Sequence, residues 1–336
     1  MGSILPAKDA KCDPGRCAQV RITLASIVPG KRSGTVAQTR RQMAGCKQMK
    51  TNNQDLPSYI LTTDCPDTTG IVAAVTNFIS DQKGLITESA HFRDPYADRS
   101  LMRTEFRGNA LPPLGELERS FSVVAGPFGM HWNFYPSGQR PKTLIAVSKQ
   151  GHCLNSILHR WSMGVLPVDI VGIVSNHDAH RKMARWYEIP YHYLPIDRDR
   201  KAEQEDRLLE IFDTSNCDLL VLARYMQILS AGVCQRLAGR CINIHHSFLP
   251  GFKGARPYHQ AYARGVKIIG ATAHYVTEHL DEGPIIEQAV ERVSHAMGPD
   301  KLMEIGHDLE SLVLLRAIRW HAEHRVFQSG PKTVIL

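Results

Sequence analysis

Hydrophobic and polar positions follow two different rhythms along the chain. In the first, between residues 57 and 137, strand-length apolar segments and helix-length amphipathic segments follow one another in the order β-α-β-β-α-β. This order is typical of a ferredoxin-like domain, an antiparallel sheet with two helices. We expect strands at 59–63, 85–92, 101–106 and 131–135 and helices at 71–79 and 114–125.

A linker rich in turn residues, at 138–142, separates this region from the second rhythm. Beyond it, short apolar runs alternate with helix-length segments, a pattern typical of a mostly parallel sheet covered by helices on both faces. Residues 143–336 are therefore expected to form a doubly wound, Rossmann-like α/β domain, which binds ligands at the carboxyl ends of its strands. The clearest strands of this domain are expected at 143–147, 168–174, 191–196 and 219–223.

The positive charge of the chain is concentrated at its beginning. Residues 1–50 contain ten Lys or Arg and two acidic residues, whereas the formal net charge of the whole chain is +7, so the remainder is close to neutral. A basic groove for nucleic acid is therefore not expected. We interpret residues 1–56 as a basic, disordered or artefactual leader, with an organelle transit peptide as the alternative.

The eight cysteines are scattered without a C-x-x-C pair. This spacing predicts neither a metal site nor a disulfide framework, and it is typical of free thiols in a reducing compartment. No run approaches the roughly 18 apolar residues of a membrane span. We expect a soluble, cytoplasmic protein without a membrane partner, or a mitochondrial or plastid one if the leader is a transit peptide.

Three polar residues provide candidate chemistry. Residues 241–245 alternate apolar and polar positions, so a strand would place Asn243 and His245 on one face. Asp281 comes just before a Gly-Pro pair that favours a sharp turn after the next strand. An amide donor, an imidazole and a carboxylate whose pKa burial would raise are the parts of an acyl transfer. The alternative is a satisfied polar pair at the end of the sheet.

Residues 243–250 resemble the catalytic strand of the folate-dependent formyltransferase family, and residues 280–286 resemble the loop that carries its catalytic aspartate. Residues 222–230 are similar to the strand and turn whose backbone holds the pterin ring. The resemblance implies that Asn243 stabilises the formyl oxyanion, that His245 orients or protonates the reacting centre, and that Asp281 is the general base. It also implies a set of folate-binding residues: Arg224, Tyr225, Met226, Gln227, Ile228, Leu229, His279 and Leu280.

Three further segments point to the hydrolytic branch of this family, the formyltetrahydrofolate deformylases. Residues 148–154 contain one glycine among bulky neighbours, which does not suit a backbone cradle for the phosphate of a second substrate. Residues 252–262 and 265–270 resemble the deformylases closely. The resemblance implies hydrolysis of 10-formyltetrahydrofolate to tetrahydrofolate and formate, which supplies formate for purine biosynthesis and balances one-carbon folate pools. It implies no metal and no permanently bound cofactor.

Two alternatives remain open: formyl transfer of the glycinamide ribonucleotide transformylase type, and a non-catalytic sensor of folate or amino acids. His246, His274 and His279 are interpreted as structural or substrate-shaping residues. Glu282 follows Asp281 directly, and neighbours on an extended loop face different ways, so Asp281 is chosen as the base.

The first domain resembles the ACT module that the deformylases carry. The resemblance implies a regulatory role, a homo-oligomer and an amino-acid effector, methionine or glycine. A helix start is expected directly after residues 67–70, where amide N–H groups could hold a carboxylate. The candidate effector site therefore comprises Asp67, Thr68, Thr69 and Gly70.

Overall fold

The computed structural model describes residues 56–251 and 257–336. The predictions for the leader at 1–55, and for the part of the deformylase-like segment at 252–256, lie outside the described residues. Within the described residues, no helix is both long and apolar enough to cross a membrane.

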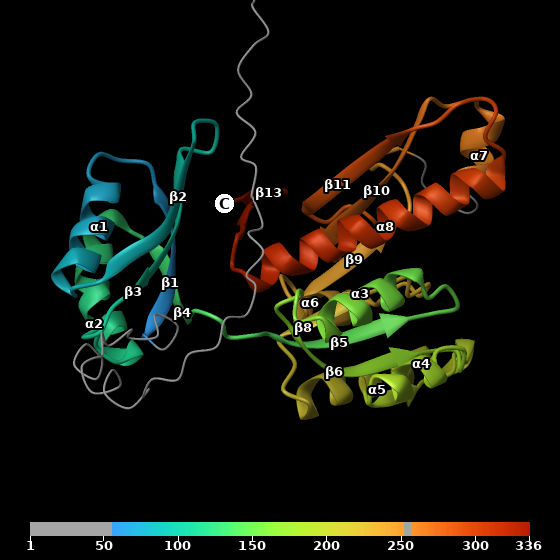
Figure 1. Ribbon diagram of the computed structural model, residues 1–336, viewed down its shortest axis with the longest axis horizontal. Helices are drawn as coiled ribbons and strands as arrows, with labels where there is room; N and C mark the ends of the chain where they lie inside the picture. The colour runs from blue at the N-terminus through green and yellow to red at the C-terminus, as the bar shows by residue number, and fades with distance from the viewer. Residues whose placement is uncertain (1–55, 252–256) are drawn as a thin grey trace, which may run out of the picture. The chain divides into compact units, whose positions relative to one another are not determined.

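The first part of the described chain forms a four-stranded antiparallel sheet in the order β2-β3-β1-β4 (Figure 1). Four aromatic side chains, Phe78, Phe106, Phe121 and Phe134, pack in its core. The elements follow the predicted β-α-β-β-α-β order: β1 (Ser58–Pro66), α1 (Ile71–Asp81), β2 (Leu85–Asp94), β3 (Arg99–Arg107), α2 (Leu114–Ala125) and β4 (His131–Pro136), with a 3-10 turn η1 (Gly126–Phe128).

Helix α1 begins at Ile71, directly after residues 67–70, as predicted. The residue before the helix is Gly70, which has a φ of 97°, and no side chain caps the helix. The Asp67 carboxylate instead forms an ion pair with Arg93 on β2. Gly70 therefore caps the helix through its backbone, whereas the Asp67 side chain is engaged by a neighbouring strand.

The second part is built on a seven-stranded sheet in the order β11-β10-β9-β8-β5-β6-β7. The strands β9, β8, β5, β6 and β7 are parallel, as predicted, whereas β10 pairs antiparallel with both β9 and β11. The antiparallel edge was not predicted, and β7 is shorter than the expected strand at 191–196. The bounds are β5 (Lys142–Val147), β6 (Asp169–Ser175), β7 (Tyr191–Tyr193), β8 (Leu219–Leu222), β9 (Cys241–His245), β10 (Ile268–Tyr275) and β11 (Ile285–Arg292).

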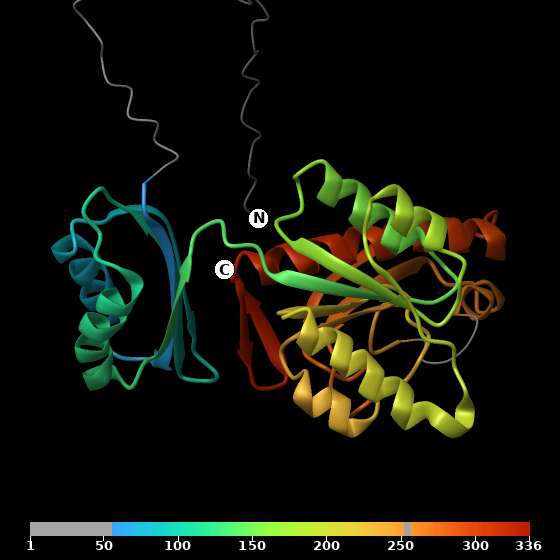
Figure 2. The same cartoon turned by 90° about the horizontal axis from the view of Figure 1, so that it is seen from below.

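Helices cover both faces of this sheet (Figure 2). One core packs α3, α4, α7 and α8 on one face, and a second core packs α5 and α6 on the other. The chain continues from α8 into a hairpin of β12 (Val326–Ser329) and β13 (Lys332–Ile335), which the sequence did not predict. The helices are α3 (His152–Ser162), α4 (Arg181–Trp186), α5 (Lys201–Thr214), α6 (Ala231–Arg236), α7 (Pro257–Ala263) and α8 (Pro299–Ala322), with a 3-10 turn η2 (Arg198–Arg200).

The strand order places a switch point at β5. The chain builds β6 and β7 on one side of β5 and then returns to build β8, β9 and β10 on the other side. The connections that follow β5 and its neighbour β8 lead to opposite sides of the sheet, which opens a crevice at the carboxyl ends of these strands. The segments after β5, β8 and β9 therefore meet at this edge of the sheet.

Candidate active site

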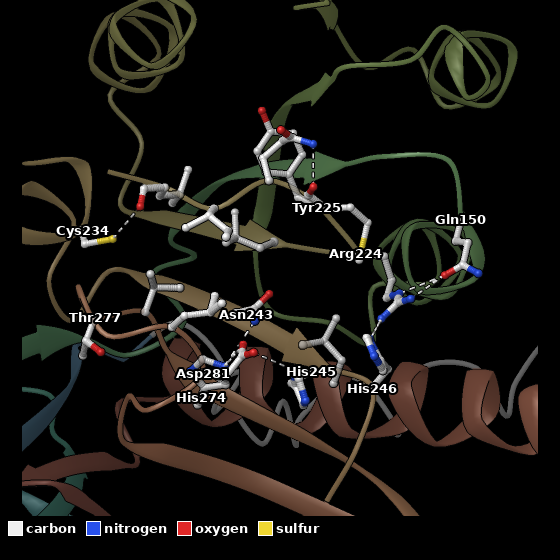
Figure 3. Close-up of a pocket in the computed structure, with 18 of the residues that line it drawn as sticks. Gln150, Arg224, Tyr225, Cys234, Asn243, His245, His246, His274, Thr277 and Asp281 are labelled. Carbon is white, nitrogen blue, oxygen red and sulfur yellow. Dashed lines mark hydrogen bonds and ion pairs between the residues drawn. The ribbon is translucent and has the colours of Figure 1, made fainter. Parts of the chain in front are cut away.

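A pocket of about 630 Å³ lies at this edge, and its walls come from the ends of β8 and β9 and from the loop after β10 (Figure 3). Three large apolar side chains in its walls, Met226, Ile228 and Leu280, are 57%, 60% and 58% exposed. Apolar side chains clustered in a concave site mark a ligand surface. All eight residues predicted to bind folate line this pocket.

Asn243, His245 and Asp281 also line the pocket and lie close together. His245 Nδ1 is 3.2 Å from Asp281 Oδ2, and the histidine side chain is almost fully buried. Asn243 Nδ2 lies 3.2 Å from His274 Nε2, which is itself 3.7 Å from Asp281 Oδ1. Figure 3 shows these four side chains grouped around the Asp281 carboxylate. The structure therefore brings the three predicted catalytic residues together and adds His274.

Strand pairing explains this grouping. Ile244 points into the core, so the residues on either side of it, Asn243 and His245, share the opposite face of β9. The antiparallel register pairs Asn243 with His274 on β10. His274 had been interpreted as structural or substrate-shaping, and the signal that could have found it was the pairing of these two strands.

The hydrogen bonds of His274 fix its tautomer. Its Nδ1 lies 2.8 Å from the backbone carbonyl oxygen of Tyr275, which can only accept, so Nδ1 carries the proton. In the neutral ring, Nε2 is then an acceptor and takes a hydrogen bond from Asn243 Nδ2. This bond uses one of the two amide N–H groups of Asn243. The other remains to donate to a ligand.

The loop that carries Asp281 has a strained and closely packed backbone. Asp281 has a φ of 58°, in the left-handed region. A Cβ atom added to Gly283 would lie 1.7 Å from the backbone oxygen of Tyr275, so only glycine fits there. Tyr275 N donates to the Pro284 oxygen at 2.9 Å, which ties the loop to the end of β10. Asp281 lines the pocket, whereas Glu282 is exposed.

The electrostatics of Asp281 correct one expectation. Burial alone would raise the pKa of its carboxyl group, but the hydrogen bond from His245 and the adjacent imidazole of His274 outweigh burial and hold this pKa well below its usual range. The expectation of a raised pKa is therefore wrong, because two imidazoles favour the charged form. Asp281 is ionised at neutral pH, and an anion of such low basicity is a poor acceptor for a proton from water.

The two ring nitrogens of His245 have different surroundings. Its Nδ1 faces the Asp281 carboxylate, whereas its Nε2 is buried and has no hydrogen-bond partner among the described residues. Buried polar atoms in proteins almost always have a partner. The unsatisfied nitrogen therefore indicates that a water molecule or a substrate group binds there.

Residues from neighbouring segments pack against the loop after β5. Ser148 Oγ donates to Asn176 Oδ1 at 2.7 Å and accepts from Met226 N at 2.9 Å. His180 Nε2 donates to the Ser148 backbone oxygen at 3.0 Å, and a Cβ atom added to Gly151 would lie 2.5 Å from the His180 ring. These contacts fill the space beside the loop with side chains. The structure thus gives a physical reason, beyond the low glycine content, why this loop does not suit a phosphate.

A buried cluster that the sequence did not predict lies next to the pocket. His152, Cys153 and Glu310 each place one potential metal ligand atom within 4.8 Å of the others. Burial and the charge of Glu310 raise the pKa of the Cys153 thiol, and Arg224 Nε already lies 3.3 Å from Glu310 Oε2. A protonated thiol and a paired carboxylate favour hydrogen bonding over a metal. The expectation of no metal stays a prediction.

The candidate effector residues Asp67, Thr68, Thr69 and Gly70 lie between β1 and α1 and do not line this pocket. The Asp67 side chain there forms an ion pair with Arg93. The effector role stays a prediction.

Comparison with known proteins identifies the family. Residues 141–318 match the family model described as formyl transferase. Over 279 residues the chain is 49% identical to formyltetrahydrofolate deformylase of Corynebacterium sp. (strain P-1), and the match covers 83% of this chain and 98% of that protein. The chain belongs to the formyltetrahydrofolate deformylase family. The resemblance drawn from the sequence motifs is thereby confirmed.

Solved structures agree with membership of the deformylase family. Formyltetrahydrofolate deformylase from Burkholderia mallei ATCC 23344 is 48% identical and superposes with a TM-score of 0.80, covering 83% of this chain and 99% of that chain. Glycinamide ribonucleotide transformylase 1 from Symbiobacterium toebii is 29% identical with a TM-score of 0.56 and covers 61% of this chain and 98% of that chain. The similarity to the deformylase is therefore closer and extends over more of the chain.

Proposed function

We propose that the chain hydrolyses 10-formyltetrahydrofolate to tetrahydrofolate and formate. The observation that carries the proposal is the pair formed by His245 Nδ1 and Asp281 Oδ2, 3.2 Å apart beside Asn243 in a pocket with apolar walls. The full-length similarity to deformylases supports water as the acceptor. The loop after β5 also supports water as the acceptor. The side chains packed beside this loop disfavour binding of the phosphate of a ribonucleotide acceptor.

In the proposed reaction, a water oxygen attacks the formyl carbon, and the carbonyl oxygen becomes an oxyanion. The remaining amide N–H of Asn243 donates to this oxyanion and stabilises it. In this proposal His245 replaces Asp281, the general base expected from the sequence: His245 Nε2 takes the proton that the water releases, and the ionised Asp281 stabilises the imidazolium through Nδ1. The bond from carbon to N10 then breaks, and N10 takes the proton from His245. Formic acid leaves and ionises to formate. No metal and no permanently bound cofactor takes part in these steps.

Folate would bind along the apolar wall of the same pocket. Met226, Ile228 and Leu280 provide exposed apolar surface for the pterin ring, and backbone groups of residues 224–229 provide polar contacts. In this proposed pose the formyl group would lie beside Asn243. His279, whose side chain is 73% exposed, would lie at the outer edge of the site.

We further propose that the four-stranded domain is an ACT-type regulatory module. Its strand order β2-β3-β1-β4 and its two helices suit that assignment. The deformylase from Bacillus subtilis is 43% identical over 277 residues and its match covers 92% of that protein, which supports the module as part of the family's architecture. A homo-oligomer, a cytoplasmic location and an effector, methionine or glycine, at 67–70 belong to the same proposal. Equilibrium dialysis with each labelled amino acid tests the effector.

Release of formate in buffer without any amine acceptor tests the function. The purified chain should convert 10-formyltetrahydrofolate to equal amounts of tetrahydrofolate and formate. Adding glycinamide ribonucleotide should not increase the rate. If formyl transfer occurs only in the presence of that amine, the transformylase alternative is correct. If the chain binds folate and releases nothing, it is a sensor.

Replacing Asp281 tests the chemistry of the site. Asp281→Asn removes the charge that stabilises the imidazolium, so we expect kcat to fall by about 1,000-fold. Tetrahydrofolate should bind nearly as tightly as it does to the wild type. Glu282→Gln is the matched control, because this neighbouring carboxylate is exposed, and it should keep normal turnover. Equal activity of the two variants would contradict the role of Asp281.

A further inference from the structure

Glu310 lies on the buried face of α8, next to Leu309 and one turn before Val313 and Leu314, and it is completely buried. Two groups donate hydrogen bonds to its carboxylate, His152 Nε2 at 2.7 Å and Tyr258 OH at 2.8 Å. Arg224 forms an ion pair with it, with Nε 3.3 Å from Glu310 Oε2.

Burial alone would raise the pKa of Glu310, but the hydrogen bond from His152 and the charge of Arg224 lower it. The group is therefore a buried anion. A buried ion is retained only where its partners satisfy it.

Arg224 links this anion to the pocket. It follows β8 with a φ of 65°, and its side chain is 9% exposed. Its Nε and Nη2 both donate to Gln150 Oε1, at 3.1 and 2.7 Å, and its Nη1 contacts His246 Nδ1 (Figure 3). A guanidinium has no acceptor, so His246 Nδ1 must accept, and the proton of this ring is on Nε2. Arg224 thereby fixes both the orientation and the tautomer of His246.

His246 lies against the proposed catalytic histidine. The rings of His245 and His246 are stacked, with centroids 4.9 Å apart and an angle of 17° between the planes. His245 therefore lies between two charged neighbours, the Arg224 cation behind His246 on one side and the Asp281 carboxylate on the other. Nearby titratable or charged groups come from each element around the site: Asp281, His274, His246, Arg224, His152, Cys153, Tyr258, His307 and Glu310.

We propose that Glu310 and Arg224 form a positioning pair for His245. The pair holds the His245 ring in place through His246, and its two opposite charges set the pH at which His245 takes up a proton. The proposal rests on the deformylase chemistry described above, in which His245 carries the proton. Glu310 and Arg224 then act through another residue and do not touch the substrate's reacting atoms. Glu310 is negative and Arg224 is positive. Removal of Glu310 and removal of Arg224 therefore change the electrostatic potential at His245 in opposite directions.

Direct titration of His245 tests this proposal without relying on activity. We would label the full chain with ¹³C at histidine Cε1, assign His245 with a His245→Asn variant, and follow its signal with pH. Glu310→Gln should lower the pKa of His245 and Arg224→Gln should raise it, each by on the order of half to one pH unit. The double variant should return close to the wild-type value, and Arg224→Lys, which keeps the charge, should also stay close to it.

Tyr258→Phe is the matched control, because it removes one hydrogen bond to Glu310 without removing a charge. The pKa of His245 should not move in this variant. The pH profile of kcat should follow the NMR titration. If Glu310→Gln does not fold, the comparison of Arg224→Gln with Arg224→Lys decides the question.

Shifts of the same sign in both charge variants, or no shift, would overturn the proposal and show that the pair is only structural. Formate release by the wild type is measured separately, so failure of the positioning role is distinguishable from failure of the proposed function. A wild type that releases no formate would contradict the function while the titration still decides the electrostatic coupling.

Discussion

Asn243 Nδ2 lies 3.2 Å from His274 Nε2, and the two residues occupy directly paired positions on β9 and β10. The bond orients an amide that is otherwise free to rotate about its last side-chain torsion. An oxyanion donor acts only where its N–H points at the developing charge. In the proposed mechanism, His274 therefore positions Asn243.

Removing His274 should separate catalysis from binding. His274→Ala leaves the Asn243 amide without its orienting acceptor, and a misplacement of about 1 Å can lower a rate by roughly 100-fold. We expect kcat to fall by about 10- to 100-fold and KM to change much less, as measured by steady-state formate release. His159→Ala, an exposed histidine on α3, is the control. A His274→Ala variant with unchanged kcat would show that Asn243 does not depend on this bond.

Gly283→Ala should inactivate the chain without unfolding it. The added Cβ would lie 1.7 Å from the Tyr275 oxygen, so the loop must shift and carry Asp281 away from His245. We expect at least about a 100-fold loss of kcat with an unchanged circular dichroism spectrum. Gly298→Ala is the matched control, because a Cβ there meets nothing within 4 Å. Similar activity of the two variants would mean that the loop adapts without moving Asp281.

The sequence predicted the parts of the site better than their connections. Alternation along 241–245 correctly placed Asn243 and His245 on one face, because that pattern is local to one strand. The partner of Asn243 depends on an antiparallel neighbour strand, and the sequence predicted a mostly parallel sheet without this exception. The charge of Glu310 among apolar residues of α8 was a visible signal, but its partner Arg224 is 86 positions earlier in the chain and could not be inferred from spacing.

The raised pKa expected for Asp281 failed for a physical reason. The expectation considered one residue and its burial, whereas its side chain, like that of Asp67, is engaged by partners distant in the sequence. Arg93 takes the Asp67 carboxylate, and His245 and His274 stabilise the Asp281 anion. Charged side chains follow their nearest opposite or donating group, which only the folded chain reveals.

His321 should make the stability of the chain depend on pH. Burial lowers its pKa to about 4, and its Nδ1 contacts Tyr275 OH at 2.7 Å. The unfolded chain takes up this proton near pH 6.5, so stability is full above that pH and falls as the pH drops toward 4. From pH 7 to pH 5 the loss attributable to this group is on the order of 2 kcal/mol.

Urea unfolding at pH 7 and pH 5 checks this expectation. His321→Gln keeps an acceptor for Tyr275 OH and removes the titration, so its stability should change less between the two pH values than that of the wild type. His159→Gln should behave like the wild type. If His321→Gln loses as much stability as the wild type, other groups cause the acid sensitivity.

The acceptor of the formyl group is the central claim, and the origin of the oxygen in formate tests it most directly. A reaction with 10-formyltetrahydrofolate in water enriched in ¹⁸O, without any amine, should give formate that carries one labelled oxygen per turnover by mass spectrometry. The tetrahydrofolate formed should equal the labelled formate. Formate without the label, or no formate until an amine acceptor is added, would contradict hydrolysis by the Asn243, His245 and Asp281 site.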